Sequence, residues 1–201
     1  MKSKKLNRKF FERSTLEVAR DLLGKFLVRK VGRKIISAMI TEVEAYIGSD
    51  DLACHASRGR TKRTEIMFGS AGHAYIYMIY GMYFCLNFVT EKKDFPAAVL
   101  IRGVVRAPQG VFPSEHSGKH LASAATRLHN PILNGPGKLC RFFQIDKSLN
   151  GEDITDSPHL WVEDRGVKIK PSQIKSSKRI GVDYAGSYKH KPWRFYINND
   201  N

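Results

Sequence analysis

Apolar residues near the start of the chain recur at helical spacing. A helix is expected to begin at Ser14 and to end before Gly24, because Ser14 and Glu17 match a capping box and glycine commonly follows a helix. Its apolar face consists of Leu16, Ala19, Leu22 and Leu23. The basic residues before it, over 1–13, are expected to form a flexible N-terminal arm.

Strand patterns dominate the rest of the chain. Strands are predicted over 26–31 and 35–47 with a turn near Gly32, over 73–79 and 82–89 with a turn near Tyr80 and Gly81, and over 97–105, 160–164 and 193–197. Helices are expected over 115–129 and after Gly135, where Pro136 suits a first turn. Residues 1–201 show no linker or repeat. We therefore expect a single mixed domain of the α+β class, with a curved, largely antiparallel β-sheet and flanking helices.

Charge narrows the choice of partner. The 201 residues include 34 Lys and Arg against 19 Asp and Glu, a formal net charge of +15. Because neutralising phosphates releases counterions, this balance favours a nucleic acid as partner. On charge alone, a solvated basic surface, a ribosome-associated protein and a membrane-surface protein stay open.

Cysteines and apolar runs indicate the compartment. Cys54, Cys85 and Cys140 are far apart and form no paired motif, which fits reduced thiols in a cytoplasm. The basic N-terminus leads into no apolar signal segment. The run 74–87 is shorter than the roughly 20 residues of a spanning helix and is rich in tyrosine, so we expect no membrane association.

The sequence TEVEAY places acidic side chains in an apolar strand. If 41–46 is extended, Glu42, Glu44 and Tyr46 share one face. A carboxylate beside an aromatic wall can act as a general base that activates water. An edge strand with a solvated acidic face is the alternative, and the pattern alone favours it.

The segment 48–72 is a long polar loop of the kind that often carries function. It offers Asp50, Asp51, Cys54 and His55, which are metal-ligand types. No second His or Cys pair lies at ligand spacing, so a hydrogen-bonding role for His55 is favoured over a metal site.

The aromatic hairpin has one residue that strand packing does not explain. Tyr80 lies beside Gly81 at the predicted turn, where a side chain projects outward. In a basic protein, such an aromatic can fill the gap that an extruded nucleotide leaves, while Tyr77 could stack on the extruded base. The alternative is that these are core aromatics of a hairpin. Ordinary strand packing is expected for the others, which are Tyr75, Met78, Phe84 and Leu86.

Two polar residues lie in apolar strands near the same region. Asn87 ends the second arm of the hairpin, either as a turn former or pointing into a shared cavity. Arg102 lies within VLIRGVV, where a buried arginine would need an anionic partner such as Glu44 or a phosphate. A surface-facing Arg102 is equally compatible with the pattern.

TEVEAYIG, the histidine eleven residues after Glu44, YIYMIYGMYFCLN, LIRG and RIGVDYAG with KPWRFY together resemble the alkyladenine (3-methyladenine) DNA glycosylase family from about residue 10 to 197. The resemblance implies monofunctional excision of alkylated or deaminated purines from double-stranded DNA, in the 3-methyladenine, 7-methylguanine and hypoxanthine class, which leaves an abasic site for base excision repair. It also implies a protruding hairpin that inserts into DNA, no cofactor and no metal. We expect a monomer in the cytoplasm, associated with the nucleoid in a bacterium, or in the nucleus of a eukaryote.

The resemblance assigns roles by position. It implies that Glu44 is the general base and Arg102 its partner in holding the water. Tyr46, His55 and Tyr77 would enclose the flipped base, Tyr80 would take its place in the stack, and Asn87 would exclude the 2-amino group of guanine. Arg102 should keep Glu44 ionised at pH 7. Phosphate contacts are expected from Arg60, Lys62, Arg63 and Lys138.

Two other function classes remain for comparison. A non-enzymatic nucleic-acid-binding protein would explain the charge and the tyrosines but leaves Glu44 and Arg102 without a purpose. A metal-dependent nuclease or deaminase lacks the ligand spacing.

Overall fold

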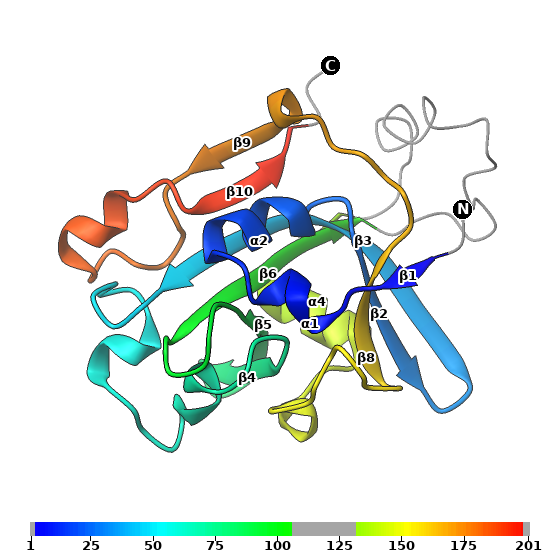
Figure 1. Cartoon of the computed structure of the whole chain (residues 1–201), viewed down its shortest axis with the longest axis horizontal. Coiled ribbons are helices and arrows are strands. Elements are labelled where there is room, and N and C mark those ends of the chain that lie inside the picture. Colours follow the sequence, from blue (N-terminus) through cyan, green and yellow to red (C-terminus); the bar gives the residue numbers. More distant parts are fainter. Residues whose placement is uncertain (1–2, 106–131, 199–201) are drawn as a thin grey trace.

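A computed structural model describes residues 3–105 and 132–198 of the chain (Figure 1). The helix expected over 115–129 lies outside these residues. The described helices are α1 (Arg8–Phe11), α2 (Thr15–Leu22) and α4 (Pro136–Phe143), with 3-10 helices η1 (His55–Arg58), η2 (Glu65–Phe68), η3 (Lys147–Leu149), η4 (Pro171–Gln173) and η5 (Gly186–His190). The strands are β1 (Lys4–Lys5), β2 (Phe26–Val31), β3 (Lys34–Ile47), β4 (Ala74–Ile79), β5 (Tyr83–Val89), β6 (Ala97–Val105), β7 (Ile132–Asn134), β8 (Leu160–Asp164), β9 (Ile174–Ser177) and β10 (Arg194–Ile197).

The strands form one curved sheet of ten strands. Its main path runs β1-β8-β2-β3-β6-β5-β4, with β10 paired to β3 and β9, and β7 paired to β6. Every pairing among the described strands is antiparallel. The prediction from the sequence, a single domain of the α+β class with a curved, largely antiparallel sheet and flanking helices, is confirmed.

Strands β3 and β6 are the centre of the molecule. All nine residues of β6 are buried, as expected for a strand of Val, Ile, Leu and Ala covered on both faces. β3 pairs with β2 over its first half and with β6 and β10 over its second half. The register between β3 and β6 shifts around Glu42. Such irregularities re-aim side chains and are common beside functional sites.

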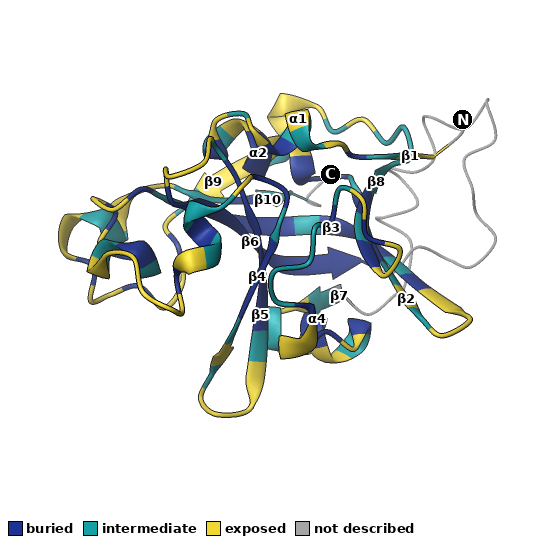
Figure 2. Cartoon of the chain, turned by 60° about the horizontal axis from the view of Figure 1, so that its bottom comes forward, coloured by how far each residue is buried: buried dark blue, intermediate teal, exposed yellow. Residues whose placement is uncertain are grey.

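Helices cover both faces of this central pair. α2 packs against β3 and β6, and α4 packs against β5 and β6 on the opposite face (Figures 1 and 2). Their apolar residues join one continuous core with the strands, in which Val18, Leu22, Leu139 and Phe143 are fully buried. The sheet is thereby fixed from both sides.

The N-terminus of α2 differs from the predicted capping box. Ser14 is the N-cap, but its side chain caps no backbone N–H and instead donates to the Glu17 carboxylate at 2.6 Å. The free N–H of Thr15 is satisfied from elsewhere, by the Glu91 carboxylate at 2.6 Å. The expected end of the helix is correct: Gly24 has φ of +83°, and a Cβ there would lie 2.8 Å from Ile169.

The expectation of a flexible arm over 1–13 is wrong for its described residues. Lys4 and Lys5 pair with β8, and Arg8 forms an ion pair with Asp153. Phe11 is fully buried, and its ring meets Phe88 edge-on at 5.9 Å. Net charge suggested a mobile tail, but the few apolar residues among the basic ones bury enough surface to hold it.

Strands β4 and β5 form the predicted hairpin, which extends from the body of the molecule (Figure 2). The turn consists of residues 80–82. Gly81 has φ of +70° and Tyr80 has φ of +51°, a region that residues with a Cβ rarely occupy. Strained backbone of this kind is concentrated at functional sites.

No helix in the described ranges is long and apolar enough to cross a bilayer.

Replacing Phe11 tests whether the N-terminal segment belongs to the core. Phe11→Ala should lower the free energy of unfolding by about 3–5 kcal/mol, because it leaves a cavity against Phe88. Phe10→Ala, at the partly exposed neighbouring position, is the control and should cost clearly less. Urea unfolding followed by circular dichroism measures both, and a negligible cost for Phe11→Ala would mean that the segment is not packed.

Candidate active site

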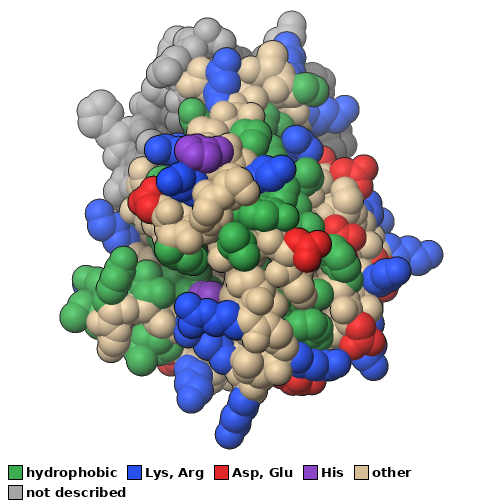
Figure 3. All heavy atoms as spheres, turned by 90° about the vertical axis from the view of Figure 1, so that its left-hand side faces the viewer, with side chains coloured by type: hydrophobic (Ala, Val, Ile, Leu, Met, Phe, Trp, Pro, Cys, Tyr) green, Lys and Arg blue, Asp and Glu red, His purple; other side chains and the backbone are tan. Residues whose placement is uncertain are grey.

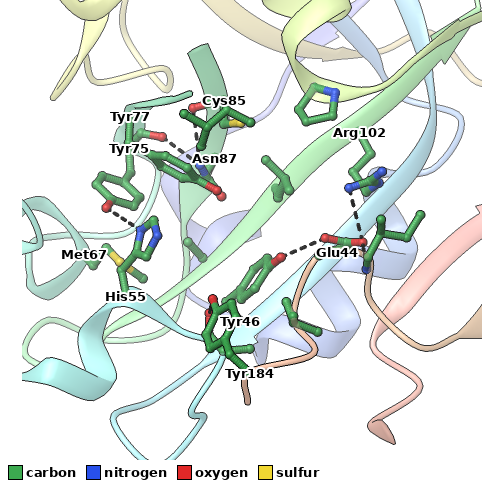
Figure 4. A pocket seen from close by; sticks show the side chains of 18 of the residues that line it. Glu44, Tyr46, His55, Met67, Tyr75, Tyr77, Cys85, Asn87, Arg102 and Tyr184 are labelled. Atoms are coloured by element: carbon green, nitrogen blue, oxygen red, sulfur yellow. Dashed lines mark hydrogen bonds and ion pairs between the residues drawn. The ribbon is translucent and has the colours of Figure 1, made fainter. Parts of the chain in front are cut away.

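A cavity of about 280 Å³ opens between the hairpin, the central strands and the C-terminal segment (Figure 4). The sequence-predicted residues that line it are Glu44, Tyr46, His55, Tyr77, Tyr80, Asn87 and Arg102. Seven residues proposed from four separate stretches of the sequence therefore line one cavity.

Strand register explains why they meet. Glu44 pairs with Leu100, Leu100 with Asn87, and Asn87 with Tyr75, so one row of side chains crosses β3, β6, β5 and β4. Side chains in register on adjacent strands share a face of the sheet. Residues two positions along each strand return to that face, which adds Tyr46, Tyr77, Cys85, Ala98 and Arg102.

Glu44 is held by donors on both of its carboxylate oxygens. Its Oε2 accepts a hydrogen bond from the hydroxyl of Tyr46 at 2.8 Å. Its Oε1 accepts one from the backbone N–H of Ile180 at 2.8 Å and lies 3.5 Å from Nη1 of Arg102. The side chain is fully buried, so its position is fixed by these partners.

Arg102 serves both acidic residues of β3. Its Nε donates to Glu42 at 3.1 Å, and Glu42 also accepts a hydrogen bond from Arg194 at 2.9 Å. The solvated acidic edge that the pattern favoured is therefore wrong, because β6 and β10 flank this part of β3 and bury both carboxylates. Arg102 is itself buried and pairs with both carboxylates, so the alternative of a surface-facing arginine is also wrong.

Burial is the largest influence on the pKa of Glu44. Loss of solvent raises the pKa of its carboxyl above the usual 4.5, while Arg102, the Ile180 N–H and the Tyr46 hydroxyl each oppose that rise. From the sequence, we expected a neighbouring Arg102 to favour the ionised form of this group. The largest effect is instead desolvation, and three donors together counteract it.

Aromatic rings form the sides of the cavity. Tyr46 lies near Glu44, and Tyr77 lies across the cavity beside His55, whose ring it meets edge-on at 4.5 Å (Figure 4). Burial raises the pKa of both tyrosine hydroxyls well above 10, so both are neutral at physiological pH. Flat neutral rings of this kind suit a planar guest.

His55 is held as a neutral imidazole. Its Nδ1 is 2.9 Å from the hydroxyl of Tyr75. Burial lowers the pKa of His55 to about 4, and the charges of Arg63 and Arg58 add to this effect. Tyr75, which the sequence assigned to ordinary packing, therefore lines the cavity and orients His55.

Asn87 lies buried at the far side of the cavity. Its Nδ2 donates to the carbonyl oxygens of Tyr75 at 3.0 Å and of Cys85 at 3.4 Å. These two bonds fix the direction in which the amide faces, so the reading as a simple turn former does not hold.

Three of the four possible metal ligands of the loop, Asp51, Cys54 and His55, have other surroundings that explain them. Asp51 forms a fully buried ion pair with Arg179. Cys54 is buried and its pKa is raised to about 12, so the thiol is protonated. Among the described residues, no three acidic, histidine or cysteine side chains come together as a metal site.

The tip of the hairpin is apolar and exposed. Tyr80 is 85% exposed, the highest value among the large apolar and aromatic residues described. Met78, Met82 and Tyr83 are exposed around it, which corrects the prediction that Met78 packs inside, whereas Leu86 is buried as predicted. Figure 3 shows an apolar projection and basic side chains around a hollow in which a histidine is visible.

The predicted phosphate contacts differ in their availability. Arg60 is engaged by Glu65 at 2.9 Å and by Asp94 at 3.2 Å. Arg63 lies over the ring of Tyr77 at 5.3 Å. Lys62 and Lys138 are exposed and form no ion pair within the described part of the chain.

Sequence reasoning missed the contribution of the C-terminal segment. Ile180 and Tyr184 line the cavity opposite the hairpin, and Arg179 lies behind Tyr46. The signal was present in RIGVDYAG, where a charged residue precedes an apolar one in a stretch without strand or helix periodicity. Nothing in that stretch indicates by itself which strand it reaches.

Comparison with known proteins gives consistent matches. The model of the family described as Methylpurine-DNA glycosylase (MPG) matches residues 9–201. A protein of Methanocella arvoryzae is 52% identical over 96% of this chain and 92% of its own length. Proteins of Alkaliphilus oremlandii and Rickettsia felis are 46% and 45% identical over 98% and 96% of this chain, and 96% and 93% of their own lengths. All three carry the name "Putative 3-methyladenine DNA glycosylase".

The titration of His55 tests the electrostatics of the cavity. We expect the imidazole to titrate near 4, and Arg63→Gln to raise its pKa because a nearby positive charge is removed. Lys62→Gln is the matched control. It also removes one positive charge, at the neighbouring position, but the charge of Lys62 does not act on His55. Imidazole NMR, assigned with His55→Gln, measures the shift. An unaltered titration in Arg63→Gln would contradict this description.

Proposed function

Because this chain belongs to the methylpurine-DNA glycosylase family, and is thus a DNA glycosylase of DNA repair, we propose that it is a monofunctional enzyme that flips damaged purines out of duplex DNA. It then hydrolyses the N-glycosidic bond with a water molecule activated by Glu44. The products are the free purine and an abasic site. The proposed lesions are 3-methyladenine, 7-methylguanine and hypoxanthine.

One observation carries the proposal: a buried carboxylate with fixed donors faces a cavity between aromatic rings. Glu44 has its two oxygens positioned by Tyr46, Ile180 and Arg102. A carboxylate that needed only a structural partner would be satisfied by Arg102 without facing an open cavity. General-base catalysis requires this combination of fixed geometry and access.

The chemical step follows from that position. Glu44 orients a water molecule towards C1′ of the extruded nucleotide and accepts its proton as the new C–O bond forms. The C1′–N bond breaks, and its electron pair leaves with the purine. The carboxylate also stabilises positive charge that develops on the sugar, and stabilisation is strong in a site that excludes water.

The character of the base decides how much further help is needed. Alkylation at N3 or N7 makes the purine cationic, so it departs readily. Tyr46 and Tyr77, with His55, enclose the flipped base, and a cationic ring is attracted to aromatic faces. A neutral lesion such as hypoxanthine departs only when the leaving purine is protonated.

Asn87 is proposed to reject normal guanine. Its amide is locked by two backbone carbonyls, so it cannot rotate away from a bulky guest. The exocyclic 2-amino group of guanine would meet this fixed side chain, whereas adenine-like bases lack the group. 7-Methylguanine has the same group, and its excision relies on the ready departure of its cationic ring. Exclusion by a rigid polar residue discriminates better than a soft apolar contact.

The exterior is proposed to engage duplex DNA. Tyr80, on its strained and exposed turn, fills the space left by the flipped nucleotide. Lys62 and Lys138 are available for phosphates, with smaller contributions from Arg60 and Arg63, whose guanidinium groups are already engaged. We propose that the protein acts as a monomer where the chromosome lies, in a bacterial cytoplasm at the nucleoid or in a eukaryotic nucleus.

Glu44→Gln tests the catalytic proposal. Single-turnover excision from duplexes containing hypoxanthine or 7-methylguanine, in EDTA and followed by alkaline cleavage, should fall by about 10²–10⁴-fold, because the amide cannot accept the proton of the water. Glu42→Gln is the matched control: it changes the same chemical group two residues away, outside the cavity, and should lose far less activity.

Equal excision by wild type and Glu44→Gln would remove Glu44 as the base. If the wild type released neither base while binding the duplex, the non-enzymatic binding protein would be the better account.

Tyr80→Ala tests the proposed insertion into DNA. Loss of one stacked aromatic should reduce excision by about 5- to 150-fold, while affinity for undamaged duplex changes much less. Fluorescence of a 2-aminopurine placed beside the lesion reports the flipping. Tyr80→Phe keeps the ring and should retain most activity; excision by Tyr80→Ala at the wild-type rate would rule out the wedge.

A further inference from the structure

A buried ion pair lies behind the cavity, and the proposed chemistry does not use it. Arg179 and Asp51 both have fully buried side chains and form a two-pronged pair, with Nη1 to Oδ2 at 2.5 Å and Nη2 to Oδ1 at 2.8 Å. Neither residue lines the cavity. Buried ion pairs are weak contributors to stability, and apolar residues of similar volume often replace them without loss. This pair therefore calls for another explanation.

Arg179 joins the C-terminal segment to the end of β3 and to the loop that follows it. Besides Asp51 in the loop, its Nη1 donates to the carbonyl of Ala45 in β3 at 2.9 Å. Its Nη2 donates to the carbonyl of Tyr188 in the C-terminal segment at 3.3 Å. The guanidinium thus fixes where the C-terminal segment crosses β3, beside the proposed base.

Two donors on Glu44 depend on that crossing. Ile180, the next residue along the chain, donates its N–H to Oε1 of Glu44 at 2.8 Å. The guanidinium of Arg179 also lies over the ring of Tyr46 at 4.7 Å, and Tyr46 donates to Oε2 of Glu44. One buried arginine therefore supports the donors of both carboxylate oxygens.

We propose that the Arg179–Asp51 pair is a positioning element that orients Glu44 for catalysis without touching the substrate. It does so by fixing the Ile180 N–H and the ring of Tyr46. This inference rests on the proposed role of Glu44 as base. Arg102 places its positive charge directly beside Glu44, whereas Arg179 fixes the positions of the groups that donate hydrogen bonds to Glu44.

Several other groups also influence the pKa of Glu44, and the test must distinguish their effects from that of Arg179. The charged and titratable groups facing Glu44, directly or through Glu42, are Glu42 and Tyr46 of β3, Tyr77 of β4, Cys85 of β5, Arg102 of β6, Arg194 of β10 and Arg179 itself. Because the Ile180 and Tyr46 donors lower the pKa of Glu44, losing their alignment should raise it.

Arg179→Lys is the decisive variant, because it keeps the positive charge but loses the two-pronged geometry and the flat stacking surface. We expect the acid limb of the single-turnover pH profile for 7-methylguanine excision to move to higher pH. Excision should fall by about 10- to 100-fold near pH 6, as expected for a lost hydrogen bond to a charged group, and recover towards wild type at alkaline pH. Arg179→Met should show the same shift, at least as large.

Arg8→Met is the matched control for stability. Arg8 also joins an aspartate and a backbone carbonyl, those of Asp153 and Ala71, but lies away from the cavity. Its pH profile should match that of wild type even if its free energy of unfolding falls. If Arg179→Met does not fold, Arg179→Lys carries the test alone.

The outcomes separate this inference from the proposed function. If Glu44→Gln is inactive but Arg179→Lys keeps the wild-type profile, the positioning role is wrong and the proposed function stands. A loss of activity in Arg179→Lys that is equal at every pH would show a structural role only and would overturn the proposal. If Glu44→Gln is as active as wild type, the proposed function itself fails.

Discussion

The structure depends on a cluster of charges enclosed between two central strands. Glu42 and Glu44 of β3 share Arg102 of β6, and the side chain of Glu44 has no solvent exposure. An unpaired carboxylate in such a place would be strongly disfavoured. The strands, the C-terminal segment and the tyrosine beside Glu44 are arranged so that both oxygens of Glu44 have a donor and Glu42 accepts from two arginines. Glu44 also lines the cavity.

The same arrangement divides the molecule into a tightly packed body and a projecting hairpin. Fully buried β6 and the helices on both faces of the sheet hold the carboxylates and the aromatic rings in register. The hairpin of β4 and β5 shares that register at its base, where Tyr77 and Asn87 line the cavity, and leaves it at the exposed tip. Recognition and chemistry can therefore be carried by one continuous sheet.

Much of this arrangement could be predicted from the sequence, where pattern and motif coincide. Strand periodicity placed Glu44 and Tyr46 on one face, and Gly81 marked the turn that exposes Tyr80. Three features could not be found in this way: the packing of Phe11, the buried pair of Arg179 and Asp51, and the role of Tyr75. Each depends on a contact between residues far apart in the sequence, such as Tyr75 with His55. Periodicity reports which face a residue occupies, not what meets it there.

The central claim is that Glu44 is an ionised carboxylate at neutral pH although it is fully buried. A ¹³C NMR titration of the Glu44 carboxyl, assigned with Glu44→Gln, tests this most directly. The account predicts a carboxylate signal at pH 7 and a pKa raised above the usual 4.5 by burial. A carboxyl that is protonated at pH 7 would contradict it, because it could not accept a proton from water.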